Sequence, residues 1–360
     1  MGKHTMKNTL IFLSLMAFTV SAYSEDGKGI SVKGLDKAGS PEQENPLTAE
    51  YRKPLPVYMS ELTNINDYNI FGNAGWDGNW YVGFNACWME EIPQPPAGEY
   101  KKAFVGVKLG RMKTRRIAGK PVWEKEAIPG LVYAAIASTP AWKSNQQYFI
   151  ASSEDIPLEA DAENALEGVG EARWFWAQVP IESVNLNGPS YIAVWSPSEY
   201  FVSVASAPIL AGGWGSKKAN SWISNDIKGY PPNNSAAALK TPISVFEPAI
   251  ILKLIPEGCE QEIPVTVSVI KDGRDRTSNK TFVADIGGDG IEKAWLEISA
   301  DGNKWVKNSR IIYSAPYMLT LLGDKMPEGK IKVRAAAVDI WGNMGYSKPV
   351  EIVVTKTTTK

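Results

Sequence analysis

Histidine is almost absent from this chain. The 360 residues contain a single histidine, His4, which lies in an amino-terminal segment that we expect to be removed on export. A mature chain without histidine excludes a Ser-His-Asp triad, a Cys-His pair, histidine-ligated zinc or copper, and a histidine acid or base. Carboxylate chemistry, oxygen-ligated metals such as calcium, and binding without catalysis remain.

Cysteine is nearly as scarce, because Cys87 and Cys259 are the only two. In an oxidising compartment they could form a disulfide that closes a loop of about 170 residues. The alternative is two separate buried thiols, and we favour the disulfide. Neither cysteine lies near the start of the exported chain, so we do not expect an anchor on a lipid-modified amino-terminal cysteine.

An excess of charge of one sign is also lacking. The chain has 38 Lys and Arg against 39 Asp and Glu. This balance gives no broad basic field for nucleic acid or anionic lipid, and we expect no nucleic-acid partner. One local basic cluster interrupts the balance, and it consists of Lys108, Arg111, Lys113, Arg115 and Arg116. The cluster is either a solvated strand end or a grip on an anionic polysaccharide.

Long apolar runs are confined to the amino terminus. Lys3 and Lys7 precede an apolar run from Leu10 to Val20, and small residues follow up to Ala22. This order predicts a secretory signal over residues 1–22. No later stretch approaches 18 uncharged apolar residues, so we expect no membrane span after cleavage. The protein is therefore expected to be secreted, periplasmic or held at the cell surface.

The chain beyond the signal is predicted to be all-β. Residues 23–55 are rich in Ser, Gly, Lys, Glu and Pro and indicate a flexible leader. Over residues 56–256, short apolar runs separated by turn formers predict a Trp-rich, jelly-roll-like β-sandwich. The predicted strands are 80–88, 103–109, 131–137, 147–150, 173–179, 191–195, 201–205 and 250–255. Only residues 157–170 favour a helix.

A polar segment bounded by Pro256 and Pro264 predicts a domain boundary. Beyond it, a hairpin from Trp295 to Trp305 turns at Asp301-Gly-Asn, and the run Val333 to Asn343 ends in Ala-x-Asp-x-x-Gly-Asn, ahead of a closing strand at 350–354. The hairpin and the run resemble bacterial extracellular domains of the immunoglobulin-like or fibronectin-III-like type. The resemblance covers residues 262–356 and implies a second β-sandwich, while leaving function open.

Tryptophan supplies the candidate binding residues. Ten of the 13 tryptophans lie between Trp76 and Trp222, and most are expected in the core. Turn formers surround Trp76, Asp77 and Asn79, a composition found both in sugar-binding or ion-binding loops and in plain hairpin turns. Glycines flank Trp214, which either stacks on a sugar ring or folds back onto the body. Trp222 follows in a long loop and completes the predicted ligand-binding set.

Metal and catalytic signals are weaker. Asp285 and Asp289 stand among glycines and could contribute oxygen ligands to calcium, although a turn between two strands explains them equally well. No other cofactor is indicated. No spacing singles out a carboxylate pair of the kind that glycoside hydrolysis needs.

We therefore expect an exported, non-catalytic protein whose N-terminal sandwich contacts an extracellular ligand, for which we favour a glycan, with the C-terminal domain as spacer or docking module. One alternative is a structural or assembly subunit of a cell-surface layer or appendage that contacts other surface proteins. The other is a carboxylate-dependent glycoside hydrolase.

Overall fold

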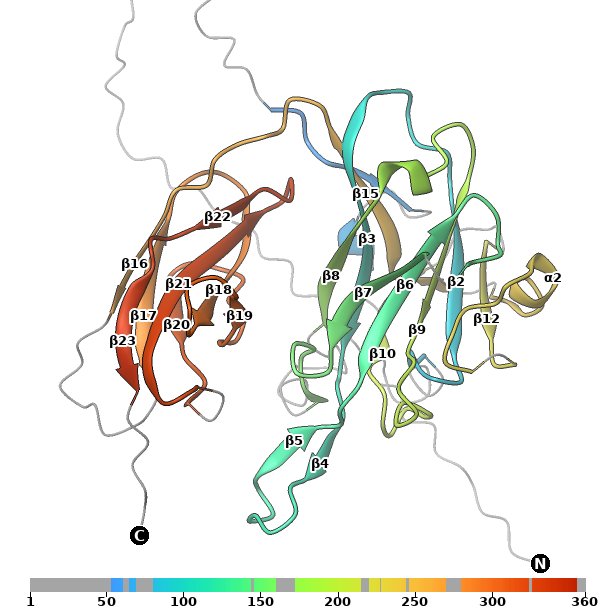
Figure 1. Ribbon diagram of the computed structural model, residues 1–360. Helices are drawn as coiled ribbons and strands as arrows, with labels where there is room; N and C mark the ends of the chain where they lie inside the picture. The colour runs from blue at the N-terminus through green and yellow to red at the C-terminus, as the bar shows by residue number, and fades with distance from the viewer. Residues whose placement is uncertain are drawn as a thin grey trace, which may run out of the picture. The chain divides into compact units, whose positions relative to one another are not determined.

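The computed structural model describes residues 53–60, 65–68, 80–143, 146–159, 172–214, 220–226, 228–243, 246–269, 280–323 and 326–354. They belong to one compact unit that comprises residues 53–360. The described chain is built almost entirely of antiparallel strands, which confirms the all-β class (Figure 1). Among these residues no helix has the length and apolar composition needed to cross a membrane.

Two sheets form the N-terminal sandwich. One has the order β1-β15-β3-β10, with β8 also paired to β3, and the other has the order β13-β12-β2-β9-β6-β7. The strands of these two sheets are β1 (Val57–Met59), β2 (Cys87–Ile92), β3 (Tyr100–Gly110), β6 (Leu131–Ala137), β7 (Gln147–Ser152), β8 (Ala172–Val179), β9 (Ser190–Trp195), β10 (Ile209–Leu210), β12 (Ser221–Ser224), β13 (Pro242–Ile243) and β15 (Ile250–Pro256). Two further pairs of strands are β4 (Thr114–Arg116) with β5 (Lys125–Ala127), and β11 (Gly212–Trp214) with β14 (Phe246–Pro248). Short helical turns are η1 (Ile65–Asp67), η5 (Ile181–Ser183) and α2 (Ser235–Ala238).

The core of this sandwich fills the space between its two sheets. Val105 and Val107 of β3 point into it from one sheet, and Trp88, Ile192 and others point into it from the facing sheet. The inward positions alternate along each strand, because successive side chains of a strand point to opposite faces. Most predicted strands of this half are confirmed, and residues 131–137 coincide with β6.

Two predicted strands are wrong. The run from Trp80 to Trp88 is not one strand, because the chain turns back at Phe84-Asn85 and the backbone N–H of Gly83 donates to the carbonyl of Ala86 at 3.1 Å. Its apolar alternation therefore spans a turn and the start of β2. Residues 201–205 form turns, although Phe201 is fully buried. Most of the predicted helix at 157–170 lies outside the described residues.

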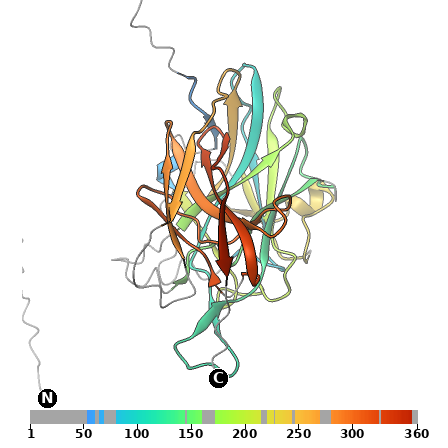
Figure 2. The ribbon, with the colours of Figure 1, turned by 60° about the vertical axis from the view of Figure 1, so that its left-hand side comes forward.

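Strands β4 and β5 form a separate two-stranded hairpin that projects from the N-terminal sandwich (Figures 1 and 2). Its strands pair in register from Thr114 opposite Ala127 to Arg116 opposite Lys125. This hairpin contributes Lys125 and Ala127 to the lining of a cavity.

Two further sheets form the C-terminal sandwich, in the orders β16-β17-β20 and β19-β18-β21-β22, with β23 also paired to β21. They enclose a second core that includes Phe282, Leu296 and Val333. The strands are β16 (Val265–Val269), β17 (Thr281–Ile286), β18 (Ile291–Ser299), β19 (Val306–Lys307), β20 (Tyr317–Thr320), β21 (Gly329–Asp339), β22 (Met344–Tyr346) and β23 (Val350–Val354). The immunoglobulin-like or fibronectin-III-like assignment itself stays a prediction.

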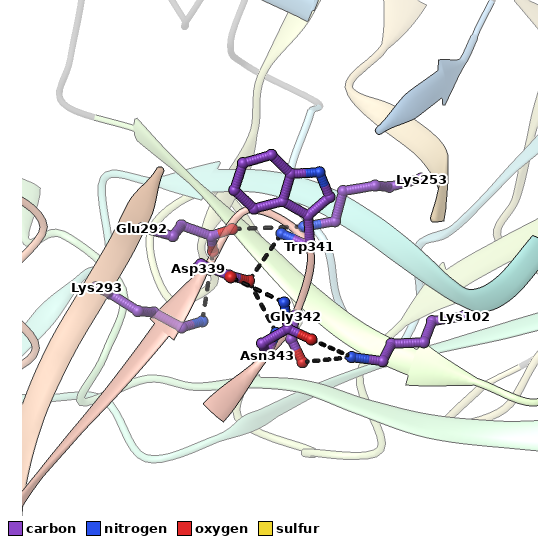
Figure 3. A network of polar contacts seen from close by, with 8 residues as sticks. All are labelled: Lys102, Lys253, Glu292, Lys293, Asp339, Trp341, Gly342 and Asn343. Atoms are coloured by element: carbon purple, nitrogen blue, oxygen red, sulfur yellow. Dashed lines mark hydrogen bonds and ion pairs between the residues drawn. The ribbon is translucent and has the colours of Figure 1, made fainter. Parts of the chain in front are cut away.

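The turn after β21 is held by one buried carboxylate. Asp339 Oδ1 accepts hydrogen bonds from the backbone N–H groups of Trp341 and Asn343, at 2.9 and 2.8 Å. Asp339 Oδ2 accepts another from the Asn343 side chain at 2.9 Å (Figure 3). Gly342 has a positive φ of 71°, a conformation that glycine adopts at little cost. The Ala-x-Asp-x-x-Gly-Asn pattern is thus a turn in which the aspartate replaces missing backbone partners.

This turn packs against the N-terminal sandwich and against the segment between Pro256 and Pro264 that joins the two sandwiches. The Trp341 ring lies in a buried cluster with Phe104, Ile255 and Cys259, and its Nε1 donates to the carbonyl of Pro54 at 2.9 Å. A Cβ on Gly342 would lie 2.3 Å from the Phe104 ring, so the backbone itself forms the contact surface.

Two lysines of the N-terminal sandwich add polar contacts to the junction, by which we mean the contact between the two sandwiches around Trp341. Lys102 donates to Gly342 O at 3.2 Å and to Asn343 Oδ1 at 2.9 Å (Figure 3). Lys253 is 2% exposed and meets Glu292 at 3.4 Å. The β18–β21 register shifts between Ile291 and Lys293, so Glu292 lies at a bulge that aims its carboxylate at Lys253.

Replacing Trp341 by Ala should lower the free energy of unfolding by about 3–5 kcal/mol, because it empties a buried aromatic position and removes the hydrogen bond from Nε1 to the Pro54 carbonyl. Urea unfolding of the full chain measures this. The control is Trp123→Ala, whose side chain is 77% exposed and whose loss should change stability by less than about 0.5 kcal/mol. Equal effects of the two substitutions would contradict the role of Trp341 at the junction.

The turn after β18 makes stability depend on acid pH. Hydrogen bonds from the backbone N–H groups of Lys304 and Asn303, and then from the Ser299 hydroxyl, lower the pKa of Asp301 from 3.8 to about 2. A lowered native pKa stabilises the fold above the unfolded pKa, and this contribution is lost as pH falls towards 2. Asp301→Ala should therefore be less stable than wild type at neutral pH, with the gap narrowing between about pH 4 and 2. Urea unfolding across that range tests this, and a gap that stays constant would contradict it.

Candidate functional site

A cavity of about 550 Å³ is the candidate site. Four parts of the chain line it: strand β5 of the projecting hairpin, the segment 154–158 after β7, Arg173 of β8, and the segment 307–313 of the C-terminal sandwich with nearby Leu322. A volume of this order suits a small ligand or one to a few units of a polymer.

Positive charge predominates in this cavity. Four cationic side chains line it against two carboxylates, Glu154 and Asp155; the cations are Lys125, Arg173, Lys307 and Arg310. Lys307 forms an ion pair with Asp155. Within the described part of the chain, Lys125 and Arg310 enter no ion pair, so the cavity keeps net positive charge that favours an anionic group.

The walls between these charges are apolar or aromatic. Ile156, Leu158 and Ile312 line the cavity, and so does Tyr313. The Arg173 guanidinium lies over the Tyr313 ring, 4.2 Å from its centre, which orients both side chains. A ligand here meets apolar surface and fixed charges together.

Asp155 is held before any ligand arrives. The Ser152 hydroxyl donates to Asp155 Oδ2 at 3.0 Å, and the backbone N–H of Asp155 donates to the Ser152 carbonyl at the same distance. The contact with Lys307 occupies its other oxygen. Asp155 thus acts as a positioning group for Lys307.

A second hollow, of about 400 Å³, lies between the end of β6 and η5. Its lining is mostly neutral and polar, with one cation, Lys143, and one carboxylate, Glu182. Because these two charges are balanced, this hollow offers less discrimination by charge than the first.

Of the predicted ligand-binding residues, the structure describes Trp222 and the backbone of Trp214. Trp76, Asp77 and Asn79 lie outside the described residues. The backbone of Trp214 belongs to β11 and pairs with Phe246, while its side chain is outside what the structure describes. Trp222 lies in strand β12 and not in a loop, is only 9% exposed and packs in the cluster that contains Cys87 and Met89. Its part in ligand binding stays a prediction.

The calcium candidates are both exposed carboxylates. Asp285 lies within strand β17, and Asp289 lies in the turn that follows it. Calcium takes six to eight oxygen ligands, and two carboxylates supply few of them. Across the described ranges, no group of three or more His, Cys, Asp or Glu residues could hold a metal ion.

The predicted basic cluster does not form one surface. Lys108 donates to the Tyr68 carbonyl at 2.5 Å, and burial lowers the pKa of Lys108. Lys113 pairs with Glu159, whereas Arg115 pairs with Glu126 at 2.9 Å. Arg111 lies 3.8 Å from Glu159. Arg116 is exposed on the β4–β5 hairpin.

The predicted disulfide is also wrong, because Cys87 and Cys259 are both free and buried. Cys87 packs with Met89 on the face of β2 that points away from the sandwich core. Cys259 lies in the cluster around Trp341, where its Sγ contacts the carbonyl of Pro54 at 3.3 Å. The two thiols thus belong to different apolar clusters.

The sequence did not indicate the cavity residues. Lys125, Arg173, Lys307 and Arg310 are scattered over both halves of the chain, and only the fold gathers them. Charge counting along the chain detects neighbours such as Arg115 and Arg116, whereas these four have no common spacing.

No protein-family model and no curated protein matches the chain. Among solved structures, the chain is similar to the glycoside hydrolase domain of Spr0440, Endo-D from Streptococcus pneumoniae R6, at 9% identity, with 73% of this chain and 33% of that chain covered and a TM-score of 0.22. A β-1,2-glucanase from Parabacteroides distasonis gives 12% identity, coverage of 76% and 31%, and a TM-score of 0.23. The chain spans about a third of the length of either structure, and these TM-scores are too low to extend fold or activity to it.

Burial raises the pKa of the Cys87 thiol, which keeps it protonated and slow to react. We expect negligible labelling of native protein by a thiol reagent such as DTNB at neutral pH, and labelling of both cysteines after unfolding without reductant. Colorimetric thiol counting measures both states. If the unfolded, unreduced protein showed no free thiols, the predicted disulfide between Cys87 and Cys259 would be supported after all.

Proposed function

We propose that this chain is an exported, non-catalytic binding protein and that the cationic cavity takes up an anionic extracellular ligand, most specifically the acidic sugar of a glycan. The observation that carries the proposal is the charge of the cavity, with Lys125 and Arg310 available beside the Lys307–Asp155 pair. Both side chains are exposed, and each can donate charge-assisted hydrogen bonds to a carboxylate, sulfate or phosphate group that enters the cavity.

The apolar walls favour a saccharide over a bare inorganic anion. Ile156, Leu158 and Ile312 offer surface to the apolar faces of a sugar ring, while the charged side chains stand among them. In this proposal the C-terminal sandwich supplies Lys307, Arg310 and Tyr313 to the site, and so it does more than act as a spacer.

A glycan array that contains matched neutral and acidic polysaccharides tests the proposal. Wild type should bind acidic members selectively, and Arg310→Gln should weaken that binding about tenfold, the order expected when a charge-assisted hydrogen bond is lost. The control is Lys348→Gln, which removes one exposed cation that does not line the cavity. Its binding should equal that of wild type.

Two results would replace the proposal. Binding that is absent for every glycan, or equal in the two variants, would favour the alternative of an assembly subunit whose contacts are with protein. Release of new reducing ends from a bound polysaccharide would favour a glycoside hydrolase.

A further inference from the structure

The β4–β5 hairpin carries an apolar tip in full contact with solvent. Val122 is 57% exposed and Trp123 is 77% exposed, the largest exposed fraction among the described large apolar side chains. Both views show the hairpin projecting from the N-terminal sandwich (Figures 1 and 2). An exposed tryptophan on a projecting element places its ring where another surface can reach it.

The tip has a defined conformation. The backbone N–H of Lys120 donates to the Ile117 carbonyl at 3.2 Å, and that of Glu124 donates to the Pro121 carbonyl at 3.0 Å. The first turn contains Gly119, whose φ is 75°, and the second has the exposed Val122 and Trp123 as its central residues. The ring is therefore presented to solvent by the backbone.

The charges of the hairpin point to an anionic partner. Arg115 is compensated by Glu126 at 2.9 Å, and Lys120 lies 3.8 Å from Glu124. The pair that remains is Arg116 and Lys125, which are directly opposite each other across the two strands. Like charges at opposed positions destabilise a strand pair, and in the described part of the chain neither has an ion-pair partner. A bound anion would remove this repulsion.

We propose that the hairpin docks onto an anionic lipid surface, with Val122 and Trp123 at the boundary between headgroups and acyl chains and with Arg116 against headgroup phosphates. Tryptophan prefers this boundary, and basic residues beside it add attraction to anionic lipid. The shape of the hairpin tip favours a lipid surface over a polymer chain. A projecting tip has no groove in which a saccharide could lie, whereas its apolar side chains can insert between lipid headgroups. An aliphatic valine beside the ring also suits hydrocarbon better than a sugar face.

Sedimentation of the full chain with vesicles tests the proposal. Vesicles of phosphatidylcholine mixed with phosphatidylglycerol should bind the protein, and vesicles of phosphatidylcholine alone should bind it much less. Trp123→Ala should reduce the partition coefficient roughly tenfold, because the ring supplies most of the inserted apolar area. Arg116→Gln should reduce it about fivefold, since one basic residue near anionic lipid contributes roughly 1 kcal/mol.

Tyr200→Ala is the matched control, because Tyr200 is a 60% exposed aromatic residue outside the hairpin. It should bind vesicles as wild type does, and thermal melts should be the same for all variants. Equal binding of wild type and Trp123→Ala, or no preference for anionic vesicles, would overturn the proposal. Since Arg116 does not line the cavity, these results are separate from those of the glycan array.

Discussion

The carboxylate of Asp339 is the constraint on which the arrangement of residues 53–354 depends. It is fully buried, and its oxygens are satisfied by the backbone and side chain of the turn that it closes. A buried carboxylate is tolerated only with such partners, so the turn has a single shape. That shape sets Trp341 among Phe104 and Cys259 and brings the backbone of Gly342 against the Phe104 ring.

The same junction explains how the cationic cavity arises. With the turn fixed, the C-terminal sandwich brings Lys307 to Asp155 and Tyr313 to Arg173. Lys253 illustrates the electrostatic cost of the junction, because burial lowers its pKa while Glu292 and the rings of Phe104 and Trp176 favour its charged form. The cost of burying the Lys253 ammonium group is thus offset by the residues in direct contact with it. The cavity lies where surfaces of both sandwiches meet with unlike charges paired and two cations left over.

Periodicity predicted the strands well where one face is buried and the other is not. Residues 131–137 and 350–354 match β6 and β23 to the residue. The prediction failed between Trp80 and Trp88, where apolar side chains alternate through a turn that is covered by the segment around Phe201. The boundary prolines and the turn at Asp339 were visible in the sequence, but the docking of that turn was not. Cavity residues such as Arg173 and Arg310 carry no local signal, because tertiary packing alone brings them together.

The linker that joins the sandwiches sets how firmly their contact holds. The Asn343 side chain donates to the Cys259 carbonyl at 2.9 Å, and Trp341 donates to the Pro54 carbonyl. The turn after β21 is therefore hydrogen-bonded both to the linker between β15 and β16 and to the start of the described chain. The junction is therefore an intramolecular complex whose partners are kept at a high effective concentration by a tether of a few residues. A longer linker would lower the effective concentration of one sandwich around the other, while every contact of the docked state stayed the same. The populations of docked and undocked protein would then respond to linker length, as they do in any pair of tethered binding partners.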